Sequence, residues 1–161
     1  MTDKNNSDFL DMIAHTPLTM DGAMGTLLYE KGILIHQCFE HLNITHRDII
    51  DGVHRLYLSA GANVIETNTF GANPFKLKPY GLENKIYDIT YQGTTIAKEC
   101  AGNNAFIAGS IGPSGLSISG LLLEAQRNIF LSGLKEQVRA FENGGADFII
   151  FESISHLIEM E

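Results

Sequence analysis

The chain has few basic residues and few cysteines for its length. Its 161 residues include 11 lysine and arginine residues against 19 aspartate and glutamate residues, which gives a formal net charge of −8. This charge argues against nucleic acid or an anionic membrane surface as a partner, because phosphate groups are bound by clustered basic side chains. Two cysteines do not make a disulfide framework, so the composition is that of a protein of a reducing compartment.

The sequence also lacks long apolar runs. No run approaches the length that a bilayer span needs, and the polar start of the chain has neither the basic nor the apolar region of a signal peptide. We therefore expect a cytoplasmic protein with no membrane partner. At this length the chain is about one domain and can bury a sizeable core.

What the chain does contain is a series of short apolar runs that do not alternate with polar residues. Such runs are typical of strands that are covered on both faces. Four are predicted as strands: Pro17–Met20, Val64–Thr67, Phe106–Gly109 and Phe148–Phe151.

Helical spacing of apolar residues fills the intervals between these runs. The first predicted helix follows a capping box at Thr45–Asp48 and ends at Gly61. Its apolar positions are Ile49, Val53, Leu56 and Ala60. The second helix spans Leu82 to Cys100, with one stripe formed by Ile86, Ile89, Gly93, Ile96 and Cys100. The third ends at Gly144 and Gly145 and points Leu134, Val138 and Phe141 inward.

Strands that alternate with helices, without a hairpin signal, predict parallel βαβ units in an α/β fold. About four units can be counted, which is half of a (β/α)8 TIM barrel of about 250 residues. Two interpretations stay open. The chain is either a four-stranded open sheet or the first half of something longer.

Acidic residues stand where three of these strands end. Asp21 opens the glycine-containing turn Asp21–Thr26, and Glu66 and Glu152 are each followed by a hydroxyl residue, Thr67 and Ser153. Strand ends of this kind form the ligand-binding mouth of α/β folds, so three carboxylates there predict a site for a small amine-bearing molecule. The alternative for Asp21 is a structural role as the cap of the following helix.

Two further motifs have weaker signals. The glycine-rich segment Gly109–Gly115 could hold a carboxylate through its backbone amides, although many loops have this composition. His36, Cys38 and His41, with Glu40 among them, have donor types that zinc accepts. No second cluster of this kind exists in the sequence, so we favour an ordinary exposed loop over a metal site.

Several blocks together resemble the zinc-dependent homocysteine S-methyltransferase family. They are Asp21–Thr26, Cys38–Asn43, Ala60–Phe70, Ala108–Pro113 and Gly144–Ser153, and their order covers nearly the whole chain. The form most similar to this one joins the domain to a methylenetetrahydrofolate reductase in bacteria. The resemblance implies a (β/α)8 barrel and transfer of a methyl group to the sulfur of homocysteine, giving methionine. It does not specify the methyl donor.

The resemblance also implies roles for individual residues. Asp21 and Glu152 would face the substrate ammonium, while Thr67 and the backbone amides near Ala23 and Ser110 would hold its carboxylate. Phe70 would form the apolar wall.

In the family, zinc is held by three cysteine thiolates from the second half of the barrel. Neither Cys38 nor Cys100 matches those positions, so the metal ligands and the catalytic centre are expected to be missing from this chain. Residues 1–161 are then expected to be a partial homocysteine-binding domain, truncated after the fourth strand and inactive alone. Its open strand edges would favour self-association. The alternatives are a non-catalytic small-molecule binding module and a structural α/β module.

Overall fold

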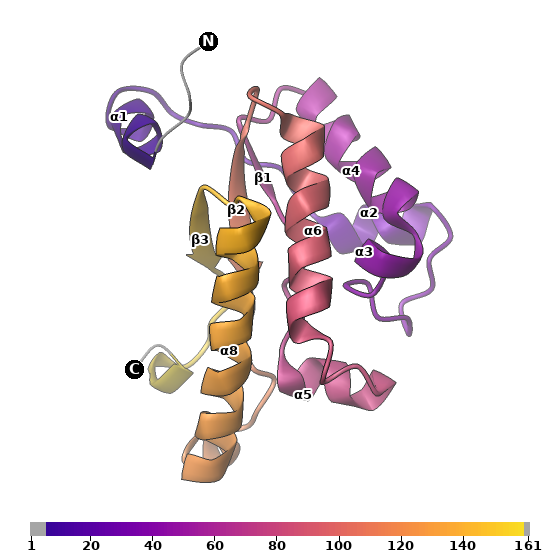
Figure 1. Ribbon diagram of the computed structural model, residues 1–161, viewed down its shortest axis with the longest axis vertical. Helices are drawn as coiled ribbons and strands as arrows, with labels where there is room; N and C mark the ends of the chain where they lie inside the picture. Colours follow the sequence, from indigo (N-terminus) through magenta and orange to yellow (C-terminus); the bar gives the residue numbers. More distant parts are fainter. Residues whose placement is uncertain (1–5, 160–161) are drawn as a thin grey trace.

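The computed structural model describes residues 6–159 as an α/β fold in which long helices pack beside a small parallel sheet (Figure 1). The strands are β1 (Val64–Glu66), β2 (Phe106–Ile111) and β3 (Phe148–Phe151). They pair in the order β1-β2-β3, and both pairs are parallel. The prediction of parallel βαβ units is therefore confirmed for these three strands.

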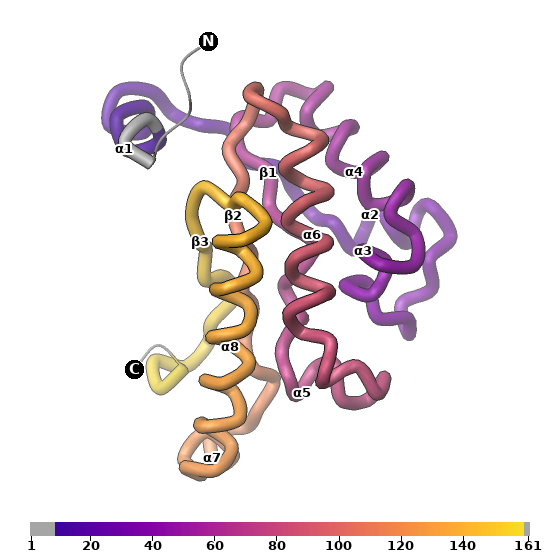
Figure 2. The backbone as a smooth tube through the Cα atoms, in the orientation of Figure 1, coloured from indigo at the N-terminus to yellow at the C-terminus, as the bar shows by residue number. Residues whose placement is uncertain are grey.

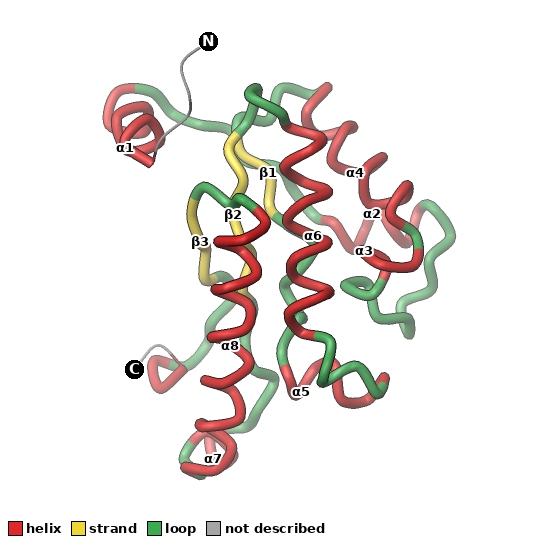
Figure 3. Tube along the Cα trace, viewed as in Figure 1, coloured by secondary structure: helices red, strands yellow, loops and turns green. Residues whose placement is uncertain are grey.

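The helices that connect the strands run next to one another, as the tube views show (Figures 2 and 3). The longest helices are α4 (Arg47–Ser59), α6 (Ile86–Ala101) and α8 (Glu124–Gly144). The other helical segments are α1 (Asn6–His15), α2 (Met24–Glu30), α3 (Leu42–Thr45), α5 (Pro74–Leu77), η1 (Lys78–Tyr80), α7 (Ile118–Leu121) and η2 (Leu157–Glu159). In the described part of the chain, no helix is both long and apolar enough to span a bilayer.

One face of the sheet packs on these helices. Ile65 and Ile107 lie in one buried cluster with Ala97 and Ala101 of α6. Gly109 allows α8 to approach β2 closely, since a Cβ atom at this position would lie 2.8 Å from the ring of Phe141. This close contact fixes α8 on the sheet.

The other face changes from apolar to polar along the strands. Its apolar end packs on α1, where the Phe9 ring stacks on Phe148 at 4.1 Å and meets Phe106 edge-on at 5.2 Å between centroids. Successive side chains of a strand alternate between faces, so Glu66 follows Val64 on this face. The carboxyl ends of the strands therefore bring polar side chains to one place above an apolar floor.

The predicted first strand, Pro17–Met20, is wrong as a strand. Only Met20 forms a ladder position, an isolated parallel bridge to Val64. The segment follows β1 through hydrogen bonds at Thr19, whose carbonyl accepts the N–H groups of Asn63 and Val64 at 2.7 and 3.2 Å. Proline at the start has no N–H to donate, and the segment lies at the exposed edge of the sheet, so the pairing extends no further.

The helix predictions hold in position but not in every detail. The capping box is wrong, because Thr45 belongs to α3 and its hydroxyl donates to the carbonyl of His41. The second helix begins at Ile86, four residues later than predicted, because Leu82 closes a turn by donating its N–H to the carbonyl of Leu77. The α6 stripe from Ile86 to Ile96 is buried as predicted.

Three of the predicted apolar positions are exposed, and one of them, Ala60, lies just beyond the end of α4. Leu56 of α4 and Val138 of α8 are 49% and 39% exposed. The buried face of α4 is rotated toward His54, which is 0% exposed. The strands also differ in burial. Strands β1 and β2 are largely buried, whereas β3 is half-buried. In the described chain no strand pairs with the outer edge of β3, which leaves this strand more exposed.

Candidate functional site

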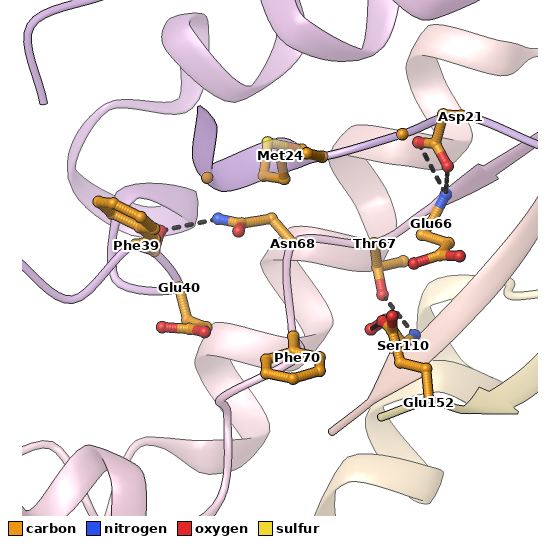
Figure 4. Close-up of a pocket in the computed structure, with 13 residues that line it drawn as sticks. Asp21, Met24, Phe39, Glu40, Glu66, Thr67, Asn68, Phe70, Ser110 and Glu152 are labelled. Atoms are coloured by element: carbon orange, nitrogen blue, oxygen red, sulfur yellow. Dashed lines mark hydrogen bonds between the residues drawn. The ribbon is translucent and has the colours of Figure 1, made fainter. Parts of the chain in front are cut away.

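A cavity of about 410 Å³ opens where the strands end (Figure 4). All six residues that the resemblance singled out line it: Asp21, Ala23, Thr67, Phe70, Ser110 and Glu152. The structure therefore brings together side chains that lie up to 131 positions apart in the sequence, from Asp21 to Glu152. Their roles toward a substrate remain predictions.

Asp21 is held by the backbone of β1. Its Oδ1 and Oδ2 atoms accept the N–H of Glu66 at 3.1 and 3.0 Å. The helix that comes next starts with Ala23 as N-cap and has no side-chain cap, so the structural alternative of Asp21 as a helix cap is wrong. Burial raises the pKa of Asp21 to about 7, and the nearby Glu152 adds to this rise.

Glu66 and Glu152 complete an acidic group in the same cavity. The pKa of Glu66 is raised by burial first, then by the negative charges of Glu152 and Asp21. The hydroxyl of Ser110 donates to Oε1 of Glu152 at 2.5 Å. None of these three carboxylates forms an ion pair with a lysine, arginine or histidine of the described chain. The raised pKa values mean that Asp21 and Glu66 hold protons near neutral pH, which a bound cation would displace.

Hydroxyl groups join the carboxyl ends of β1 and β2. Thr69 donates its hydroxyl to the Ser110 carbonyl at 2.7 Å, and Thr67 shares a 2.6 Å hydrogen bond with Thr69. The Thr67 hydroxyl oxygen also accepts the N–H of Ser110 at 3.1 Å. These bonds fix the position of Thr67, but they use the Ser110 N–H inside the protein. The N–H of Ala23 has no acceptor within residues 6–159.

The opposite wall is fixed by two side-chain amides. Asn68 donates to the Phe39 carbonyl at 2.7 Å and to Oδ1 of Asn43 at 2.9 Å. Asn43 in turn donates to the carbonyls of Asn68 and Ile89, at 2.8 and 3.0 Å. This network ties the turn after β1 to α3 and α6. The sequence places Asn68 in the polar run Glu66–Thr69 that ends the strand and is typical of a binding rim, whereas Asn43 has no signal of its own, because a buried asparagine has no recognisable spacing.

Seven further residues line the cavity besides those six: Gly22, Met24, Gly25, Phe39, Glu40, Glu66 and Asn68. Glu66 carried a visible signal as an acid at a strand end. Glu40 was considered only as a neighbour of possible metal ligands. Its Oε1 atom accepts the N–H of Gly71 at 2.8 Å, which holds the loop before α3 against the turn after β1.

The residues around Cys38 have a different arrangement from a metal site. The Cys38 thiol donates to Oε2 of Glu40 at 3.4 Å, and burial raises its pKa to about 12. In this arrangement the thiol keeps its proton and donates it to Glu40, and Cys38 is buried instead of lying in the exposed loop that we favoured. Within residues 6–159, no group of three or more His, Cys, Asp and Glu side chains could hold a metal ion.

Comparison of the sequence with known proteins identifies a matching family and several relatives. Residues 18–161 match the family model of homocysteine S-methyltransferase. The chain is 31% identical, over 168 aligned residues, to the methionine synthases of Mycobacterium leprae and Mycobacterium tuberculosis. The alignments cover 97% of this chain but 14% of each relative, so the chain spans about a seventh of the length of these proteins.

Solved structures of similar fold include the homocysteine methyltransferase MmuM from Escherichia coli. Its metallated form superposes with a TM-score of 0.75 at 20% identity, covering 93% of this chain and 58% of that one. Its oxidised form gives a TM-score of 0.77 at 23% identity, covering 98% and 59%. At these identities the likeness concerns the fold. The three-stranded sheet and its helices thus correspond to somewhat more than half of that structure.

Proposed function

Because the chain belongs to the homocysteine S-methyltransferase family, we propose that its cavity binds homocysteine, the methyl acceptor, by its amino-acid end. The observation that carries this proposal is the group of carboxylates of Asp21, Glu66 and Glu152, which share one cavity without a lysine or arginine to neutralise them. A ligand with an ammonium group supplies the missing charge. The family supplies the identity of that ligand.

In the proposed complex, the substrate ammonium lies against Asp21 and Glu152, which gather with Glu66 on one side of the cavity (Figure 4). Its carboxylate is held by the N–H of Ala23, and by the hydroxyls of Thr67 and Ser110 once these turn from Thr69 and Glu152 toward the ligand. Phe70 forms the apolar wall along the substrate side chain. A charge-assisted hydrogen bond at each end of an amino acid both selects and orients it.

The family transfers methyl groups, and we propose that this chain contributes the acceptor-binding part of that activity. The sheet would form the N-terminal half of a (β/α)8 barrel, and residues 1–161 a partial homocysteine-binding domain. The match to 58–59% of the solved homocysteine methyltransferase supports this assignment. A cytoplasmic location remains an expectation from the sequence, and the resemblance specifies neither the methyl donor nor an accompanying reductase domain.

Zinc activates the homocysteine sulfur in this family by favouring its thiolate. The residues of this cavity do not fit such a metal. Its lining has carboxylates, hydroxyls and amides but no cysteine or histidine, and thiolate is the ligand expected for this zinc. We therefore assign binding and orientation of the acceptor to this chain and no step of methyl transfer. Alone, the chain is proposed to be inactive.

Calorimetric titration with homocysteine, together with zinc analysis of the purified chain, tests this proposal. We expect homocysteine to bind without zinc, and Asp21→Asn and Glu152→Gln each to weaken binding about tenfold, the loss of one charged contact. Asp48→Asn, on the exposed surface of α4, is the matched control and should bind normally.

Three outcomes would contradict parts of the proposal. Homocysteine binding that is unchanged in both site variants would favour a structural module. One zinc ion per chain would overturn the assignment of the metal ligands to residues outside the chain, and His36, Cys38 and His41 would then be the next residues to change. Zinc-dependent formation of methionine by the isolated chain would overturn its proposed inactivity.

A further inference from the structure

A second cavity, of about 430 Å³, shares a wall with the acidic one. Phe39, Glu40 and Phe70 line both cavities. The remaining lining of the second cavity differs in chemistry, with aromatic rings and one lysine in place of the acidic group. These residues include Phe75, Lys76, Tyr80 and Ser114.

Lys76 is the cation of this cavity and has no carboxylate partner. Its Nζ atom lies 4.5 Å from the centroid of the Phe70 ring, and it forms no ion pair within the described chain. The one carboxylate that lines the cavity, Glu40, is engaged by the N–H of Gly71 and the thiol of Cys38. The Lys76 ammonium is therefore available to an anion.

The glycine-rich loop after β2 fixes both members of this cation–aromatic pair. A Cβ atom on Gly112 would lie 2.6 Å from the Phe70 ring, so the ring rests directly on the loop backbone. Gly115, at a φ of 81°, lies against the aliphatic stem of Lys76, 3.6 Å from where its own Cβ would be. A preformed ammonium of this kind needs little reordering to bind a ligand.

The same loop already holds a carboxylate in this structure. The N–H and the hydroxyl of Ser114 both donate to Oε1 of Glu159, the first at 2.9 Å. Ser114 is completely buried and lines the second cavity. Two donors on one buried residue, converging on one oxygen, make a specific carboxylate site. Its occupant here is a side chain of the protein itself.

We propose that Ser114 and Lys76, which both line the second cavity, form a carboxylate-binding subsite for the second ligand of this domain, and that Glu159 takes the two donors of Ser114 in the free chain. The aromatic walls favour a ligand that joins its carboxylate to a planar or apolar body. Resting on the function proposed above, this ligand is the methyl donor. It would lie next to the acceptor, with Phe70 and Glu40 between the two cavities.

NMR titration of the 161-residue chain with benzoate, a planar carboxylate, tests the subsite. We expect Glu159→Gln to strengthen benzoate binding about threefold, because it removes the competing carboxylate, and Lys76→Met to weaken it about tenfold. Methionine keeps the apolar stem that packs on Gly115, so this variant should fold. Lys78→Met, on the exposed η1 segment, and Glu124→Gln, at the exposed start of α8, are matched controls.

Benzylamine, with the same ring and the opposite charge, should not bind in the second cavity. The subsite is overturned if the Lys76 and Glu159 variants bind benzoate as the wild type does, or if benzylamine shifts the resonances of Lys76 and Ser114 as benzoate does. A separate titration with homocysteine keeps the two proposals distinguishable. Loss of homocysteine binding with benzoate binding intact would refute only the acceptor site, and the reverse result would refute only the subsite.

Discussion

Asp21 shows at the residue scale how position changes the chemistry of a common side chain. Both of its oxygens accept the same backbone N–H, of Glu66, yet burial still raises its pKa to about 7. Desolvation therefore outweighs the hydrogen bonds. Ionised Asp21 therefore lowers the free energy of unfolding, and we interpret its presence here as a requirement for binding an ammonium group.

Because the ionised Asp21 side chain destabilises the folded state, a substitution that cannot ionise should stabilise the protein. Unfolded Asp21 titrates near its usual 3.8 and folded Asp21 near 7, so the folded state binds this proton more tightly. Stability from this group is present at acid pH and is lost as the pH rises toward 7. Asp21→Asn can still accept the Glu66 N–H but cannot ionise. We expect it to unfold at higher urea concentration than the wild type at about pH 8, with a smaller difference at about pH 5.

Equal midpoints for the two proteins at both pH values would contradict the raised pKa. Asp48→Asn on the exposed face of α4 should leave both midpoints unchanged. The same Asp21 variant should bind homocysteine more weakly, so stability and binding should move in opposite directions.

His54 makes an opposite pH prediction. Burial lowers its pKa to about 4, and neither ring nitrogen has a hydrogen-bond partner within the described residues. The unfolded state then binds the proton more tightly below the usual 6.5, so stability is complete above about pH 6.5 and falls as the pH falls toward 4. Between about pH 6.5 and pH 4 the free energy of unfolding is expected to fall by about 3 kcal/mol.

His54→Leu should remove that acid-side loss, because leucine has no proton to take up. Urea unfolding between about pH 4 and pH 7 measures the slope, with exposed His15→Leu as the control. A slope that is the same in the wild type and in His54→Leu would show that His54 does not titrate as its burial implies.

At the scale of the elements, the site depends on how closely α3, α6 and the turn after β1 approach one another. Asn43 links them, and Gly93 of α6 leaves the space for its amide. A Cβ atom on Gly93 would lie 2.5 Å from Nδ2 of Asn43 and 3.0 Å from Cγ2 of Thr69. Gly52 of α4 is also inside a helix, but a Cβ atom there meets nothing within 4 Å.

The two glycines therefore predict opposite effects of the same substitution. Gly93→Ala should lower the free energy of unfolding by about 1–3 kcal/mol, because a tightly packed network must shift. Gly52→Ala should raise it by about 0.5–1 kcal/mol, because alanine restricts the unfolded chain without a clash. Thermal unfolding of both variants measures the difference. Similar effects of the two substitutions would show that Asn43 can move away without cost.

The elements also show where sequence patterns fail. Val64–Glu66 and Phe148–Phe151 could be found because buried strands are continuous apolar runs with clear ends. Pro17–Met20 has a similar composition but lies at an exposed edge, where only Met20 is paired. The composition of a short segment does not reveal how many neighbours it will have in the sheet.

At the scale of the whole molecule, the outer edge of β3 is the exposed part of the sheet. Within residues 6–159, β3 pairs only with β2, and Phe151 at its end is 44% exposed. Unpaired edges of this kind favour association with another strand. We therefore expect the isolated chain to self-associate as its concentration rises.

Sedimentation velocity over a concentration series tests this expectation. Phe151→Lys should shift the distribution toward the monomer, because a charged residue at a strand edge opposes pairing. Leu122→Lys, at an exposed position outside the sheet, should have no such effect. A wild-type chain that stays monomeric at all concentrations would refute association through this edge.

The sequence by itself determined the α/β class, the positions of three strands and the acids at the ends of two of them, Glu66 and Glu152, because these depend on local runs of apolar residues and on the polar residues that end each run. Only the tertiary structure decided that Asp21, Glu66 and Glu152 share one cavity, that Asn43 fixes its wall, and that Ser114 lies beside Lys76. Those relations depend on the packing of helices across the sheet. That packing brings together residues whose separation in the chain carries no signal.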